Sequence, residues 1–338
     1  MKAKKIVSVI LALALVFALA ACGGSSSSST QTTTPAEPEE IKIGVMQFGE
    51  FTALINAYEG FVAGLAEAGY VDGQNIKINY LSAAADTSNC PTIADTLIND
   101  GSDLIFAIAT PSVACIKEKT SDIPVLFTAV TDPVGSGLVA SNDAPGANIT
   151  GTSDMNPVAE QINLLVELLP EAKTVAVMYC SSETNSAAQY ELAKAQLEKL
   201  GLICVQKTIS AIDEAKSAVE SLKGQVDAIY IPTDNTLADG MNIVAAAAID
   251  CGIPTICGEP GEVQAGGTIT YGIDYYKLGQ QTAKMAVKVL EADDPIAVTA
   301  KMPVEVQTEG FETSLNQATV DALGITVPQS ILDRATIY

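Results

Sequence analysis

The feature that most constrains this chain is a regular alternation of short apolar runs with helix-length amphipathic segments, from Ile41 to about residue 291. The run DLIFAIATPS at 103–112 shows the pattern, because an acid precedes Leu, Ile, Phe and Ala, and Thr, Pro and Ser end the run. Apolar runs between polar ends are typical of strands that are buried on both faces of a parallel sheet. The alternation therefore predicts an α/β fold of doubly wound parallel sheets with helices on both faces.

The two halves of the chain repeat this order. The Asp-led run DLIF at 103–106 is matched by DAIY at 227–230, and the strand that follows begins with Ile-Pro in both halves, at 123–124 and 253–254. A helix, an Asp-led strand, a polar stop, another helix and an Ile-Pro strand follow one another in each half. Coincidence is the alternative, but the shared order favours two similar α/β lobes built by duplication, for which 338 residues are sufficient.

Charge and residue types exclude several classes of function. The chain has 18 Lys and Arg against 40 Asp and Glu, a net charge of −22, which repels nucleic acid and anionic lipid surfaces. It has no histidine, so Ser-His-Asp catalysis and imidazole metal ligands are absent. Its one arginine, Arg334, lies near the end of the sequence, so we expect no bidentate arginine clamp on a carboxylate or phosphate. We expect a protein that is not an enzyme and that needs no cofactor and no metal.

The first 22 residues are typical of an export signal. A basic start is followed by an apolar run from Ile6 to Leu19 and by Leu-Ala-Ala-Cys at 19–22, which resembles the lipobox of bacterial lipoproteins. Residues 23–40 are rich in Gly, Ser and Thr and predict a flexible tether. A plain signal peptide that is cleaved nearby is the alternative. We expect an extracytoplasmic protein that touches the bacterial membrane only through a lipid on Cys22.

The other six cysteines form no C-x-x-C motif, so a zinc or redox centre is not indicated. Most are expected to be small buried hydrophobic residues. Cys90 and Cys115 lie in the first turns of consecutive predicted helices on one face of the first sheet, which makes them a candidate disulfide pair.

The carboxyl ends of the predicted strands are where an open parallel sheet binds ligands. The candidate ligand-binding residues there are Gln47, Phe48, Glu50, Thr110, Ser112, Thr128, Ala129, Tyr179, Asn185, Thr233, Asp234, Asn235, Glu259 and Asp274. Hydroxyls and helix-start N–H groups near Thr110, Ser112 and Thr128 would hold a carboxylate, and an ammonium group would meet one of the three acids Asp234, Glu259 and Asp274. The alternative is that these hydroxyls and acids only cap helices.

Aromatic residues near the same strand ends would form an apolar slot for a ring. They are Phe48, Phe51, Phe127, Tyr179 and Tyr271, each of which is otherwise ordinary core. The chain has no tryptophan, which disfavours a sugar as the ligand.

Several segments, taken in order, resemble the substrate-binding lipoproteins of ABC importers in the tryptophan/tyrosine-type family. They are KIGVMQF, AGYVDGQNIKINY, LIFAIATPS, PVLFTAVTDPVGSGLV, NITGTSD, AIYIPTDNT and TYGIDYYKLGQQTAKMA. The resemblance implies a type I periplasmic-binding-protein fold, with two lobes, three crossovers and a ligand in the cleft between the lobes. Members of the family bind aromatic amino acids or related small molecules, and they deliver them to an ABC permease. The cysteine content and the C-terminal segment of this chain depart from the family pattern.

These observations predict a monomeric receptor for an aromatic L-amino acid. Residues 41–150 with about 273–300 would form the N-terminal lobe, and 151–272 with about 301–338 the C-terminal lobe, with the first crossover near 148–153. A branched-chain amino acid or a nucleoside-like solute is the alternative ligand. A secreted enzyme using a carboxylate pair such as Asp132 and Glu259, or a sensor domain, is the alternative class.

Overall fold

The structure is a computed structural model that describes residues 40–338, so the predicted signal peptide, its lipobox Cys22 and nearly all of the tether lie outside it. Two sheets organise the described residues. All strands of the first sheet are parallel, in the order β11-β5-β4-β3-β1-β2. They span β1 Ile41–Gln47, β2 Ile76–Ser82, β3 Leu104–Ile108, β4 Val125–Val130, β5 Ile149–Ser153 and β11 Glu305–Val306.

The second sheet has the order β13-β12-β10-β9-β8-β6-β7. Its strands span β6 Thr174–Cys180, β7 Ile203–Ile209, β8 Ala228–Ile231, β9 Thr255–Cys257, β10 Ile269–Gly272, β12 Glu312–Leu315 and β13 Ala335–Ile337. The pairing of β10 with β12 is antiparallel, and the other pairings are parallel.

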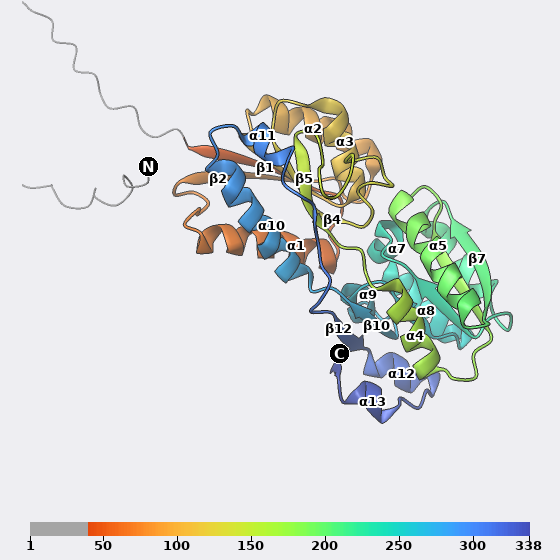
Figure 1. The fold of residues 1–338 in the computed structure, drawn as a ribbon. Helices are drawn as coiled ribbons and strands as arrows, with labels where there is room; N and C mark the ends of the chain where they lie inside the picture. The colour runs from red at the N-terminus through yellow and green to blue at the C-terminus, as the bar shows by residue number, and fades with distance from the viewer. Residues whose placement is uncertain (1–39) are drawn as a thin grey trace, which may run out of the picture. The chain divides into compact units, whose positions relative to one another are not determined.

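Helices cover both faces of each sheet, as the alternation predicts. The α-helices span α1 Thr52–Glu67, α2 Cys90–Asn99, α3 Thr110–Lys119, α4 Val158–Leu168, α5 Thr184–Lys199, α6 Ala215–Glu220, α7 Asn235–Asp239, α8 Met241–Cys251, α9 Pro260–Gln264, α10 Tyr275–Leu290, α11 Pro295–Thr299, α12 Gln317–Leu323 and α13 Gln329–Leu332. Two short 3₁₀ turns, η1 Thr87–Asn89 and η2 Ile212–Glu214, precede α2 and α6. Figure 1 shows α1 and α10 together on one side of the first sheet and α2 and α3 on the other.

The sequence echo has a structural basis, because the core strands of both sheets follow the same order, β2-β1-β3-β4-β5 and β7-β6-β8-β9-β10. Asp103 accepts a hydrogen bond at 2.8 Å from the backbone N–H of Lys42 at the start of β1. Asp227, at the equivalent place, accepts from the backbone N–H of Thr174 at the start of β6, also at 2.8 Å. Each Asp thus joins the start of its own strand to that of the neighbouring strand.

Sheet membership differs from the expected division at two places. All of β5 pairs with β4 in the first sheet, so the chain leaves that sheet after Ser153 rather than at residue 150. The strand β11 also joins the first sheet, beside β5, and the chain reaches the second sheet again only at β12. The chain therefore passes between the sheets at 154–157, 273–274 and 307–311.

A further difference concerns the segment 235–251, which the pattern predicts as one helix. It is divided at Gly240 into α7 and α8. A side chain at Gly240 would overlap Ile212 of η2, so the glycine lets the loop after β7 pack against the break between α7 and α8.

The disulfide predicted between Cys90 and Cys115 is not formed, and all six cysteines of residues 40–338 are free. The helices α2 and α3 do pack against each other, but Cys90 is buried in the core of the first lobe, whereas Cys115 is only partly buried. Burial, with the Cys115 thiol nearby, raises the pKa of Cys90 to about 11. A buried, protonated thiol is chemically inert.

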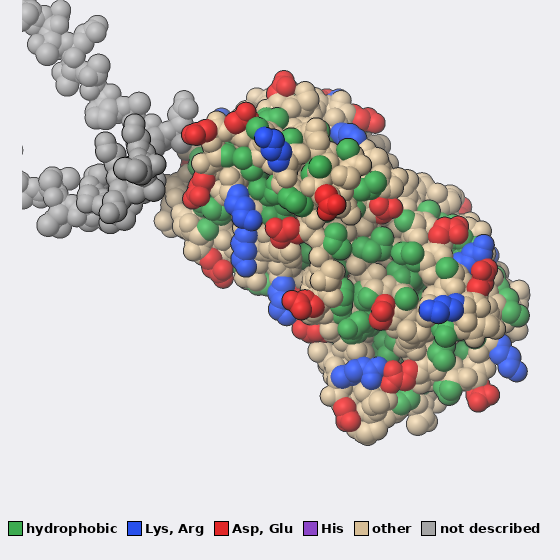
Figure 2. Space-filling view, in the orientation of Figure 1, with side chains coloured by type: hydrophobic (Ala, Val, Ile, Leu, Met, Phe, Trp, Pro, Cys, Tyr) green, Lys and Arg blue, Asp and Glu red, His purple; other side chains and the backbone are tan. Residues whose placement is uncertain are grey.

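The surface of the described residues carries the acidic excess in a dispersed form. On the face in Figure 2, acidic and basic side chains are scattered among uncharged ones rather than gathered into a patch of one sign. No helix within residues 40–338 has both the length and the hydropathy that crossing a bilayer requires.

Candidate functional site

A cavity of about 670 Å³ lies where the carboxyl ends of strands from both sheets face each other. Loops that follow β1, β2, β3 and β4 form one wall, and loops that follow β6, β7 and β8 form the other. Its lining residues are Phe48, Ala85, Asp86, Thr87, Thr110, Pro111, Ala114, Ser136, Ser182, Glu183, Thr184, Asn185, Ser210, Ala211, Ile212, Thr236 and Asp239. Both lobes therefore contribute to one site.

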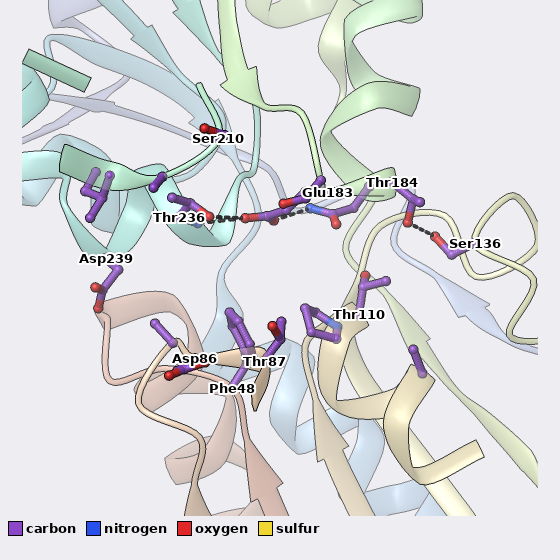
Figure 3. Close-up of a pocket in the computed structure, with 17 residues that line it drawn as sticks. Phe48, Asp86, Thr87, Thr110, Ser136, Glu183, Thr184, Ser210, Thr236 and Asp239 are labelled. Atoms are coloured by element: carbon purple, nitrogen blue, oxygen red, sulfur yellow. Dashed lines mark hydrogen bonds between the residues drawn. The ribbon is translucent and has the colours of Figure 1, made fainter. Parts of the chain in front are cut away.

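The two ends of the cavity differ in chemistry (Figure 3). Asp86 and Asp239 lie toward one end, and Thr110, Thr184 and Ser136 lie toward the other. At the hydroxyl end, the side-chain oxygens of Ser136 and Thr184 are hydrogen bonded to each other at 2.9 Å, which joins the two walls. The lining contains three acids and no Lys, Arg or His.

Two long helices begin at the hydroxyl end. The helix α3 starts at Thr110 and α5 starts at Thr184, and neither has a side-chain cap on its first turn. Backbone N–H groups at such helix starts bind anions. This end of the cavity is therefore suited to a carboxylate group.

Backbone strain is concentrated on the first-lobe wall. All non-glycine residues with positive φ in the described part of the chain are alanines near the carboxyl ends of β2, β3 and β4, namely Ala84, Ala85, Ala109 and Ala129. Ala109 has φ 78° and ψ 151°, a region that is populated almost only by glycine, and it directly precedes Thr110. Strain of this kind persists where the surrounding structure holds a functional geometry.

Glu183 organises the second-lobe wall. Its Oε1 accepts from the backbone N–H and the hydroxyl of Thr236, at 2.8 and 2.7 Å. Its Oε2 accepts from the backbone N–H and the side-chain amide of Asn235, at 2.9 and 2.7 Å, and from the amide of Asn185 at 3.2 Å. The carboxylate therefore closes the start of α7 and also holds Asn185 in place.

Three of the predicted site residues line the cavity, namely Phe48, Thr110 and Asn185. In the first lobe, Gln47, Ser112, Thr128 and Ala129 are buried beside it without lining it. Glu50 is exposed and accepts a hydrogen bond from the Tyr80 hydroxyl at 2.8 Å. In the second lobe, Tyr179 is buried and its hydroxyl accepts from Gln206. The backbone N–H of Thr233 donates to Gln189, and the Asn235 amide donates to Glu183.

The three acids expected to meet an ammonium group do not line the cavity, and each of them caps a helix. Asp234 caps α7, Glu259 caps α9 and Asp274 caps α10, in each case by accepting hydrogen bonds from backbone N–H groups of the first turn. Burial, with the Glu183 carboxylate nearby, raises the pKa of Asp234 to about 8. Burial likewise raises the pKa of Glu259 to about 7.

The expected aromatic slot is reduced to Phe48. Phe127 is in the core of the first lobe, and Tyr271 packs against Phe311, with ring centroids 5.7 Å apart. The carboxylate pair of the alternative enzyme is also used structurally, since Asp132 accepts from the backbone N–H of Gly135 at 2.8 Å. No group of His, Cys, Asp and Glu side chains in residues 40–338 is placed to hold a metal ion.

Two equivalent loops were missed by the sequence reasoning. They follow β2 and β7 and contribute Ala85, Asp86 and Thr87, and Ser210, Ala211 and Ile212, to the lining. A signal was present, because Ser-Ala-Ala-Ala-Asp at 82–86 and Ser-Ala-Ile-Asp at 210–213 follow corresponding strands of the two halves.

Comparison with known proteins identifies relatives across nearly the whole described chain. Residues 42–337 match the family model of the ABC transporter substrate binding proteins. A tyrosine-binding protein from Clostridioides difficile (strain R20291) is 39% identical over 281 residues, which cover 83% of this chain and 80% of that protein.

Two solved structures are similar at the same level of identity. The ABC domain from Streptococcus pneumonia in complex with L-Trp is 38% identical, with a TM-score of 0.83, over 88% of this chain and 99% of that one. The ligand-free, open structure of a substrate-binding protein from Clostridium difficile is also 38% identical over 88% and 99%, but with a TM-score of 0.68. The conformation described here is therefore more similar to the L-Trp complex, and the predicted two-lobe fold of type I periplasmic binding proteins is confirmed.

Proposed function

Because the chain belongs to the family of ABC transporter substrate-binding proteins, we propose that it is the receptor that captures an aromatic L-amino acid for an ABC importer. Proteins of this family bind a small ligand outside the cytoplasm and are not enzymes. Transfer of the ligand to a membrane permease is the step that the family implies.

The observation that carries the proposal is the composition of the cavity. Phe48 gives an aromatic surface, and the uncapped start of α5, together with the N–H of Thr110 at the start of α3, gives N–H groups for a carboxylate within the same space. A volume of about 670 Å³ falls within the range of small-molecule sites, roughly 300–1,000 Å³. The relatives bound to L-Trp or named for tyrosine support an aromatic side chain.

The proposal includes a lipid anchor at Cys22, which rests on the Leu-Ala-Ala-Cys sequence alone. Metabolic labelling with a palmitate analogue should label the full chain, and Cys22→Ser should abolish both the label and retention in the membrane fraction. Equal labelling of the variant would contradict the anchor.

The ligand is tested by a thermal-shift screen of the full chain against the 20 amino acids, sugars and nucleosides. A ligand at 100 times its dissociation constant should stabilise the protein by about 2.7 kcal/mol. We expect L-Trp, L-Tyr or L-Phe to give the largest shift. A larger shift with leucine or with a nucleoside would show that one of the alternative ligands is the true one. Chemical conversion of the ligand would indicate an enzyme.

A further inference from the structure

Asn185 presents an unpaired hydrogen-bond acceptor at the cavity wall. Its side chain lines the cavity and is only 3% exposed. Its Oδ1 atom has no hydrogen-bond partner within residues 40–338. Buried side-chain oxygens nearly always accept a hydrogen bond, so we expect a bound ligand to supply the donor for this atom.

The orientation of the Asn185 amide is fixed by its other end. Nδ2 donates to Oε2 of Glu183 at 3.2 Å and to the backbone carbonyl of Thr233 at 3.1 Å. The Glu183 carboxylate and the Thr233 carbonyl have no proton to give, so a flipped amide would place oxygen against oxygen at both contacts. Only the third contact of Nδ2, to the Ser186 hydroxyl at 3.3 Å, would tolerate the flip. Oδ1 therefore remains the free end.

The position of this atom relates it to the carboxylate end of the cavity. Asn185 follows Thr184, where the uncapped helix α5 begins. In an α-amino acid one carbon separates the carboxylate from the ammonium group. If the ligand's carboxylate binds at the start of α5, its ammonium group lies close by and needs an acceptor there. Oδ1 of Asn185, one residue along the helix, can be that acceptor.

The surrounding charge also favours a cation. The Glu183 carboxylate lies next to the Asn185 amide, and the cavity lining carries no Lys, Arg or His. If an N–H or O–H of the ligand's aromatic ring bound Asn185 instead, the ammonium group would have no acceptor near the carboxylate-binding end. The other acids of the lining, Asp86 and Asp239, lie toward the opposite end (Figure 3).

We propose that Asn185 accepts a hydrogen bond from the ligand's α-ammonium group through Oδ1, and that it thereby selects ligands with a free amine. This rests on the proposed function, because it assigns one contact of the same site. Glu183 is a positioning residue, since both of its carboxylate oxygens accept hydrogen bonds from protein groups, one of which is the Asn185 amide.

The test compares two ligands that differ only in the amine. Calorimetric titration of the full chain with L-tryptophan and with indole-3-propanoate, or with L-tyrosine and 3-(4-hydroxyphenyl)propanoate, gives the preference for the amine as a ratio of dissociation constants. The variants are Asn185→Leu and Asn185→Ala, the second of which adds no bulk to the cavity. Asn235→Leu is the matched control, because Asn235 also donates to Glu183 but does not line the cavity.

We expect the wild-type protein to prefer the amine, and both Asn185 variants to lose about tenfold of that preference, as for one hydrogen bond to a charged group. The control should keep the wild-type ratio even where it weakens both ligands. An unchanged ratio in the Asn185 variants, or an equal loss in the control, overturns the assignment while the receptor role stands. Failure of the wild-type protein to bind any aromatic amino acid overturns the proposed function and this contact with it.

Discussion

Replacement of Glu259 by Gln should make the stability of the protein less dependent on pH. Glu259 is only 2% exposed and caps α9, where Oε2 accepts from the backbone N–H of Gly261 at 2.5 Å and Oε1 from that of Glu262 at 2.8 Å. None of the ion pairs found in residues 40–338 involves it. Its negative charge is therefore balanced only by backbone dipoles.

The sign follows from the direction of the pKa shift. Burial raises the pKa of Glu259 from 4.5 to about 7, with a smaller contribution from the Asp154 carboxylate, while its two backbone hydrogen bonds lower it. Between these two values the folded protein holds a proton that the unfolded chain has released. This stabilisation is complete below pH 4.5 and is lost as the pH rises through 7. For one such site, the free energy of unfolding falls by about 2.5 kcal/mol between pH 5 and pH 8.

The assay is urea unfolding of the full chain at pH 5, 6, 7 and 8, with linear extrapolation to water. At pH 5 the Gln variant should be less stable than wild type by about 1 kcal/mol, because one capping bond is lost. By pH 8 the variant should equal or exceed wild type, since it has no charge to bury. Glu198→Gln, on the exposed part of α5, is the control for the loss of one negative charge.

The control should shift all four values by a similar amount. A constant offset between Glu259→Gln and wild type from pH 5 to pH 8 would refute the reasoning, because it would mean that the buried carboxyl releases its proton as easily as an exposed one. Between pH 5 and pH 8 the free energy of unfolding of the wild-type protein should fall by more than Glu259 alone accounts for, since burial raises the pKa of Asp234 and Asp154 as well.

Three further substitutions test the packing, the strain and the closure of the cavity. Gly60→Ala should cost more than about 2 kcal/mol in urea unfolding, because its methyl group would overlap the backbone of α10, and a loss below 1 kcal/mol would show that the helices can separate. Ala109→Gly, directly after β3, should raise the free energy of unfolding by about 1 kcal/mol by relieving the strained backbone, whereas Ala107→Gly within β3 should lower it. Ser136→Ala removes the 2.9 Å bond to Thr184 between the walls and should weaken binding of L-tryptophan about threefold through faster dissociation; an unchanged rate would exclude a role in closure.

Much of the fold could be predicted because its signals are local. The apolar runs between polar ends became strands that are buried on both faces, and Asp103 and Asp227 mark corresponding strand starts in the two sheets. The strands β11, β12 and β13 were not predicted, because their sequences, Glu-Val, Glu-Thr-Ser-Leu and Ala-Thr-Ile, form no apolar run. Their place in the sheets is decided by tertiary pairing.

The site was predicted in part for a related reason. Phe48, Thr110 and Asn185 could be predicted because they follow strands with clear apolar runs. The loops after β2 and β7 could not, because the half-exposed residues of these strands give a weak strand signal. The capping role of Asp234, Glu259 and Asp274 could not be distinguished in advance, because an Asp or Glu at a helix start looks the same in sequence whether it binds a ligand or caps the helix. Only the distance to the nearest backbone N–H separates the two roles.

The shortage of cations links these helix caps to the cavity. With 18 basic residues against 40 acids and no histidine, buried carboxylates must find other donors. Asp234 and Glu183 use the start of α7, Glu259 uses that of α9, and Asp154 accepts from the Tyr275 hydroxyl at 2.6 Å.

The long helices that open onto the cavity, α3 and α5, are not closed by an acid in this way. A carboxylate of the protein that capped α3 or α5 would repel the proposed carboxylate of the ligand. The cavity lining has no arginine that could bind the ligand's carboxylate in place of these N–H groups. Acidic side chains take the N–H groups at the starts of α7, α9 and α10, whereas the starts of α3 and α5 remain free for the ligand. An acid cap introduced at position 109 that reached the start of α3 would therefore compete with the ligand directly, whereas the carboxylate of Glu183, which precedes α5, is already bound by N–H groups of α7.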